Sequence, residues 1–113
     1  MICRLWRGWT IKTNADAYEK VVRGIVIPAI EANRIAGFRH IDLMRLERDD
    51  EYEFTTLMWF DSLDSVKDFI GDDYSVSLVP PQARAVLSRF DERAAHFEVL
   101  DRRPRSEQLT LPL

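Results

Sequence analysis

Residues 38–60, FRHIDLMRLERDDEYEFTTLMWF, decide the fold because they predict two long strands joined by a short polar turn. The stretch 52–60 is the strongest strand pattern in the chain, since aromatic and β-branched residues favour strands. The stretch 38–48 has the same character, and Asp49, Asp50 and Glu51 lie between the two. The pattern therefore predicts an antiparallel hairpin.

Two further strands are predicted on either side of this hairpin. Ile2–Thr10 is rich in β-branched and aromatic residues, and Ala94–Leu100 is a shorter run of the same kind. A short helical segment over Gln82–Phe90 precedes the last strand, with Pro81 suited to its first position.

Two longer helices are predicted between the strands. Asn14 is placed to cap the first, which carries an apolar stripe at helical spacing: Tyr18, Val21, Val22, Ile25 and Ala29. Pro28 has no N–H for the carbonyl of Gly24, so a kink or break is expected there. Ser62 is placed to cap the second helix, and Gly71 to end it.

The order strand, helix, strand, strand, helix, strand predicts a ferredoxin-like βαββαβ fold of the α+β class. Its antiparallel sheet has both helices on one side, and residues 1–100 form one domain. The other sheet face is expected to be bare and to carry Arg4 and Trp6, with Tyr52, Phe54 and Met58 on the neighbouring strand. Such a face needs a cover, and a second copy that closes a barrel around a cavity is the simplest one.

The composition restricts the function classes. The 113 residues are 46% apolar and 31% charged, with a net charge of −3. This charge argues against bulk electrostatic binding to nucleic acid or to an anionic membrane surface. No apolar run approaches the roughly 20 residues of a membrane span, the start lacks a signal-peptide pattern, and Cys3 is the only cysteine. A cytoplasmic location is the simplest expectation.

Several short motifs resemble the antibiotic biosynthesis monooxygenase-like family. They are Ile2-Cys3-Arg4-Leu5-Trp6-Arg7-Gly8, Asn14-Ala15-Asp16-Ala17-Tyr18, Met58-Trp59-Phe60-Asp61-Ser62-Leu63-Asp64-Ser65-Val66, Val79-Pro80-Pro81-Gln82-Ala83-Arg84 and His96-Phe97-Glu98-Val99. The resemblance covers about residues 1–100 and implies a homodimeric α+β barrel. It also implies oxygenation of polyphenolic molecules without a cofactor. The family's haem-degrading branch has an Asn on the first strand, a Trp in the second helix and a His soon after it. This chain has no such Asn, Phe69 in the Trp's place and no His in 72–80.

A cofactor-free oxygenase needs a base, a cation to hold an oxyanion and an apolar pocket. His96 and His40 are the candidate bases, since histidine titrates near neutrality, and Arg4 is the candidate cation. Two histidines without a third ligand make a weak metal site, so no metal is expected. The non-catalytic alternatives are that both histidines lie at strand edges or in solvent, and that Arg4 forms an ion pair at a dimer rim.

Three aromatic residues are candidates for substrate binding: Trp6, Tyr52 and Trp59. Trp6 shares a strand face with Arg4, so it would stack on a substrate ring beside the cation. The alternative for Trp6 is packing in a dimer core, and for Trp59 packing beneath a helix. A half-buried strand tyrosine such as Tyr52 needs no ligand.

The tail, residues 101–113, is expected to be extended or disordered. Its end, Gln108–Leu113, resembles the short peptide with which bacterial replication proteins dock onto the sliding clamp. The alternative is a strand added to a sheet edge.

Two functions thus remain open from the sequence. One is a cofactor-independent monooxygenase of an aromatic or polyphenolic molecule, and the other is a non-catalytic dimer of the same fold that binds a small molecule or acts in stress.

Overall fold

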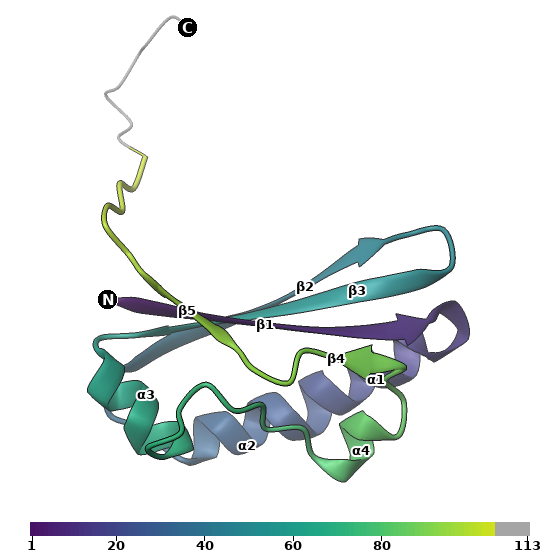
Figure 1. The fold of residues 1–113 in the computed structure, drawn as a ribbon, viewed down its shortest axis with the longest axis horizontal. Coiled ribbons are helices and arrows are strands. Elements are labelled where there is room, and N and C mark those ends of the chain that lie inside the picture. Colours follow the sequence, from purple (N-terminus) through teal and green to yellow (C-terminus); the bar gives the residue numbers. More distant parts are fainter. Residues whose placement is uncertain (106–113) are drawn as a thin grey trace, which may run out of the picture.

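A computed structural model describes residues 1–105 of the chain. Its five strands form one antiparallel sheet in the order β2-β3-β1, with β4 and β5 paired along the other side of β1. The strands are β1 (Ile2–Ile11), β2 (Phe38–Glu47), β3 (Glu51–Phe60), β4 (Arg89–Phe90) and β5 (Ala95–Glu98). All helices lie on one side of this sheet (Figure 1). The predicted ferredoxin-like α+β fold is therefore confirmed, while the tail motif Gln108–Leu113 lies outside the described residues.

The helices follow the predicted order, with one turn of unusual geometry. They are a 3-10 turn at Lys12–Asn14, α1 (Ala15–Val21), a π-helical turn at Val22–Val26, α2 (Ile27–Ala32), α3 (Leu63–Ile70) and α4 (Pro81–Arg84). Pro28 does not break the first helix. The N–H of Ile27 instead bonds to the carbonyl of Val22, five residues back. The wider turn carries the chain past the proline, which cannot donate a hydrogen bond.

Two local predictions were wrong. Residues 82–90 are not one helix: α4 ends at Arg84, and Arg89–Phe90 is extended and pairs with β1. Asn14 makes no side-chain capping bond, because its amide points to the carbonyl of Val86 at 3.5 Å. The cap predicted at Ser62 is confirmed, since its hydroxyl accepts from the N–H of Ser65.

The predicted direction of the sheet faces was also wrong. Arg4 and Trp6 point toward the helices, as do Met58 of β3, which pairs with Arg4, and Phe54, which pairs with Gly8. A strand exposes alternate residues on opposite faces, so the uncovered face carries the other set. That set includes Cys3, Leu5, Leu57, Trp59 and Phe97.

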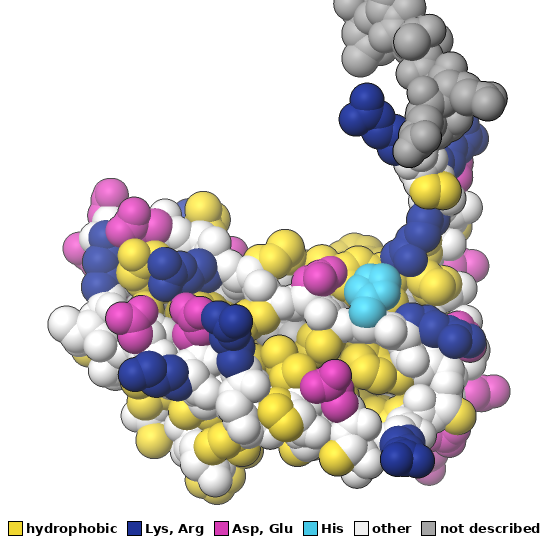
Figure 2. Space-filling view, turned by 180° about the vertical axis from the view of Figure 1, so that it is seen from behind, with side chains coloured by type: hydrophobic (Ala, Val, Ile, Leu, Met, Phe, Trp, Pro, Cys, Tyr) yellow, Lys and Arg dark blue, Asp and Glu magenta, His cyan; other side chains and the backbone are white. Residues whose placement is uncertain are grey.

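Charged side chains of both signs pair across the surface of the described residues. Lys12 contacts Glu47, and Arg45 lies near Asp16 and Glu19. Figure 2 shows acidic and basic side chains gathered near the end of the molecule where the β2–β3 hairpin lies, and hydrophobic ones toward the middle. No described helix is both long and apolar enough to cross a membrane.

Candidate active site

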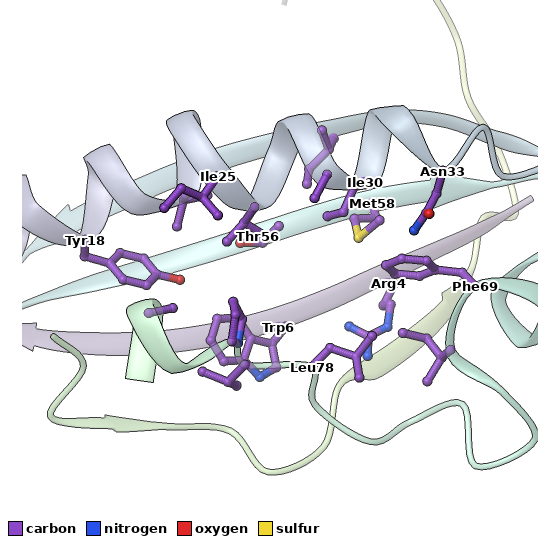
Figure 3. Close-up of a pocket in the computed structure, with 18 residues that line it drawn as sticks. Arg4, Trp6, Tyr18, Ile25, Ile30, Asn33, Thr56, Met58, Phe69 and Leu78 are labelled. Carbon is purple, nitrogen blue, oxygen red and sulfur yellow. The ribbon is translucent and has the colours of Figure 1, made fainter. Parts of the chain in front are cut away.

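A cavity of about 240 Å³ lies between the helices and the face of the sheet that they cover. Figure 3 shows β1 and β3 beneath it, the first helix on one side and the 71–80 loop on the other. Most of its lining is aliphatic or aromatic. Its few polar side chains are Arg4, Trp6, Tyr18, Asn33 and Thr56. A concave apolar site with a few convergent polar groups is typical of ligand binding.

Arg4 is the single charged residue among the described residues that line the cavity. Its side chain is only 6% exposed. Nη2 donates to the carbonyl of Val76 at 2.8 Å, while Nε is buried without an acceptor among the described residues. Burial lowers the pKa of Arg4 from 12.5 to about 10. The guanidinium therefore stays protonated at neutral pH, by about a thousand to one.

No carboxylate of the described residues lies within ion-pair distance of Arg4, although ten such pairs occur elsewhere. A buried cation without a counter-ion is costly. Its charge is available to an anion that enters the cavity.

The ring of Trp6 is fixed beside Arg4. Its Nε1–H donates to Oγ of Ser77 at 2.8 Å and to the carbonyl of Asp91 at 2.7 Å. Gly8 makes room for this ring, since a Cβ there would lie 3.1 Å from Trp6 and 2.9 Å from Leu87. With its N–H bonded to the protein, Trp6 offers the cavity an aromatic surface for stacking.

Tyr18 brings a hydroxyl to the cavity from α1. Its ring packs on Phe54 with centroids 4.8 Å apart, and the residue is 2% exposed. Burial raises the pKa of Tyr18 to about 12, so the hydroxyl keeps its proton at neutral pH. The sequence indicated only that Tyr18 belongs to a helical apolar stripe.

The two histidines lie on opposite faces of the sheet. His96 is next to Arg4 in the β1–β5 register, and its ring meets Tyr74 edge-on at 5.1 Å. Its Nε2 is buried without a partner among the described residues, and His96 does not line the cavity. Burial and then Arg4 lower the pKa of His96. His40 is exposed and packs on Trp59 across the uncovered face, at 4.2 Å between centroids.

Tyr52 and Trp59 also lie outside the cavity. The hydroxyl of Tyr52 donates to Glu47 at 3.0 Å near the hairpin end of the sheet. Trp59 is not beneath a helix: it lies on the uncovered face, where Arg102 stands over its ring at 5.6 Å. The structure thus brings Arg4 and Trp6 together in the cavity and places His96 next to Arg4 on the neighbouring strand β5. His40, Tyr52 and Trp59 lie outside the cavity.

No protein-family model and no curated protein matches this chain. Its fold nevertheless matches solved structures over most of their length. A Bacillus cereus protein with the provisional name antibiotic biosynthesis monooxygenase is 11% identical, with a TM-score of 0.58 over 95% of this chain and 98% of that one. The chain has the antibiotic biosynthesis monooxygenase fold.

Two further structures with this fold agree. Rv0793 from Mycobacterium tuberculosis is 16% identical, with a TM-score of 0.57 over 89% of this chain and 96% of that one. A mutant of SnoaB, a cofactor-independent oxygenase from Streptomyces nogalater, is 17% identical, with a TM-score of 0.51 over 92% of this chain and 98% of that one. The resemblance inferred from the short motifs is confirmed at the level of the fold.

Proposed function

We propose that the protein is a cofactor-independent oxygenase of a small aromatic molecule, which binds in the cavity with one ionised oxygen at Arg4. The observation that carries this proposal is the buried guanidinium without a counter-ion among the described residues, in an apolar cavity beside the fixed ring of Trp6. The ring stacks on Trp6, and the negative charge of the substrate compensates the positive charge of Arg4.

Arg4 would lower the pKa of a bound phenol, so that the phenol loses its proton without a catalytic base. A phenol of the tyrosine type has a pKa of about 10, and an opposite charge within about 4–6 Å lowers such a value by about 1–3 units. Binding beside Arg4 would therefore raise the ionised fraction at pH 7.5 from well under about 1% to between about 3% and 75%. The proton leaves to water, so no side chain has to remove it. His96 is next to Arg4 in the β1–β5 register but does not line the cavity, so it is not the base in this proposal.

An ionised, electron-rich ring can reduce dioxygen itself. When a ring methylene next to the phenolate becomes a carbonyl, one oxygen atom enters the substrate and the other leaves as water. The substrate supplies all four electrons, and the two methylene hydrogens leave in the water. The protein's tasks are to hold the charge, to stack the ring and to exclude solvent.

The proposal includes a homodimer. The uncovered sheet face carries Leu5, Leu57 and Trp59, and Phe97 on it is 54% exposed. An apolar face of this kind needs a cover, and a second copy related by a two-fold axis would apply the same patch to itself.

Oxygen uptake tests the proposed reaction. Purified protein is incubated with a panel of phenols and ring ketones while dissolved oxygen and products are followed, with ¹⁸O₂ to trace one atom into the product. We expect turnover with the wild type and at least a tenfold loss of kcat/KM in Arg4→Met. The matched control is Arg7→Met, which should keep its turnover. Arg7 lies on the same strand as Arg4, but it is exposed and forms an ion pair with Asp91.

A second candidate is binding without turnover. It is favoured by the lining, in which no histidine or carboxylate of the described residues contacts the cavity and burial raises the pKa of Tyr18 to about 12. In that case tryptophan fluorescence would report saturable, Arg4-dependent binding of phenols, and oxygen would not be consumed with any of them.

A further inference from the structure

The hydroxyl of Tyr18 is a further polar group that lines the cavity. It points into the cavity from α1 (Figure 3), and it makes no hydrogen bond to any described residue. A buried tyrosine hydroxyl normally has a partner, and leaving it without one costs stability. Because the residue is 2% exposed, a partner reaches the hydroxyl only through the cavity that it lines.

Tyr18 and Arg4 lie toward opposite ends of the cavity. Tyr18 packs on Phe54, which pairs with Gly8 across the sheet, four residues along β1 from Arg4. Four residues of a strand span about 13 Å. Both side chains extend toward the middle, where Trp6 lies between them (Figure 3). The gap between the two polar groups is therefore shorter than about 13 Å, a distance that a small aromatic molecule with an oxygen at each end can span.

The volume of the cavity points the same way. Pockets for drug-sized molecules occupy about 300–1,000 Å³, and this one has about 240 Å³. The volume lies below the range for drug-sized molecules, which favours a one- or two-ring ligand over a larger one.

From these observations we infer that the ligand is a one- or two-ring aromatic molecule with oxygens at both ends, an ionised hydroxyl on Arg4 and a carbonyl that accepts from Tyr18. Tyr18 is then a specificity-determining residue that selects the acceptor and sets the direction in which the ring lies on Trp6. This inference rests on the proposed binding of an ionised phenol in the cavity.

The test uses the full chain and four small probes. 4-Acetyl-1-naphthol carries both oxygens, 1-naphthol lacks the acceptor, and the methyl ether of 4-acetyl-1-naphthol lacks the ionisable hydroxyl. 1-Hydroxypyrene has four rings. Affinities are measured by tryptophan fluorescence and calorimetry for the wild type, Tyr18→Phe and Arg4→Met.

Tyr18→Phe should weaken binding of 4-acetyl-1-naphthol about three- to tenfold, as expected for one neutral hydrogen bond, and change that of 1-naphthol less than twofold. Arg4→Met should weaken 4-acetyl-1-naphthol at least tenfold and its methyl ether less than twofold. 1-Hydroxypyrene should bind at least tenfold more weakly than 1-naphthol. The matched control is Tyr52→Phe, which removes a hydroxyl bonded to Glu47 outside the cavity and should change nothing.

The ring of Tyr18 remains in Tyr18→Phe, so its packing on Phe54 is kept, and thermal unfolding of the variant checks this. Equal effects of Tyr18→Phe on 4-acetyl-1-naphthol and 1-naphthol, or none on either, would overturn the inference while leaving Arg4-dependent phenol binding intact. If none of the probes binds the wild type, or Arg4→Met binds them all as well as the wild type, the proposed function fails and this inference with it.

Discussion

Replacing Arg4 with methionine should stabilise the unliganded protein while it weakens the binding of an ionisable phenol at least tenfold. Methionine has nearly the length of the arginine stem, so it fills the same space without the charge. The pKa of Arg4 falls from 12.5 to about 10 in the folded state. At about 1.36 kcal/mol per pKa unit, this corresponds to a cost of about 3 kcal/mol for keeping the guanidinium charged in the fold.

The sign of this cost follows from proton linkage. The folded state binds the proton of Arg4 less tightly than the unfolded state does, so at every pH well below about 10 the charged side chain lowers the stability of the fold. Removing Arg4 also removes its hydrogen bond to Val76, which contributes about 1–2 kcal/mol. The net gain is about 1–2 kcal/mol, or a rise of about 4–8 °C in Tm for a chain of this length.

The assay is thermal and urea unfolding of wild type, Arg4→Met and Arg7→Met at one protein concentration, since dimerisation makes Tm depend on concentration. Arg7→Met loses a half-exposed ion pair and should lower the stability by no more than about 1 kcal/mol. A fall in Tm of more than about 2 °C in Arg4→Met would refute the reasoning. It would mean that Arg4 holds the 71–80 loop to the sheet and is not kept for a ligand.

Three other changes test the surroundings of the cavity. Gly8→Ala should lower the stability by about 1–3 kcal/mol and weaken ligand binding, because its Cβ would press on Leu87 and on the ring of Trp6. Thermal unfolding and fluorescence titration measure the two effects, and a variant unchanged in both would contradict the prediction. His96 has a lowered pKa, caused first by burial and then by the nearby guanidinium. The stability linked to it is therefore complete above about pH 6.5 and is lost as the pH falls toward the folded pKa; His96→Gln should flatten the fall in Tm between about pH 7.5 and 5. Phe97→Glu places a charge on the uncovered face and should give a monomer in light scattering, whereas a monomeric wild type would end the dimer proposal.

The order of the elements could be predicted because each has a local signal. Alternation and β-branched residues mark the hairpin of residues 38–60, and the cap at Ser62 and the stop at Gly71 mark α3. These signals depend on residues close in sequence, which is why they survive without knowledge of the tertiary structure.

The direction of the sheet faces could not be predicted in this way. β1 carries apolar side chains on both faces, Trp6 on one and Leu5 on the other, so its alternation does not decide which face is inside. Arg4 favoured the wrong direction for its face of β1, because a charged strand residue normally points to solvent. Here it points inward, since the neighbouring residue positions on β3 are Met58 and Thr56, which the helices cover.

The role of the Tyr18 hydroxyl could not be predicted from the sequence for a related reason. At its position in the helical stripe a ring is sufficient to explain the residue, and phenylalanine would pack on Phe54 equally well. The hydroxyl is the part that packing does not require. A tyrosine inside an apolar stripe therefore indicates a candidate binding residue, because its hydroxyl needs a hydrogen-bond partner.

The same reasoning connects Arg4 and Tyr18. Each leaves polar atoms unpaired among the described residues in one apolar cavity, yet they come from different elements, β1 and α1, and no local requirement of either element explains them. Buried groups of this kind lower the stability of the unliganded fold, so two of them around a single space of about 240 Å³ are better explained by a ligand than by the core. The double variant Arg4→Met with Tyr18→Phe should then be more stable than the wild type and should bind 4-acetyl-1-naphthol more than tenfold more weakly. A purely structural role for either residue does not produce this combination.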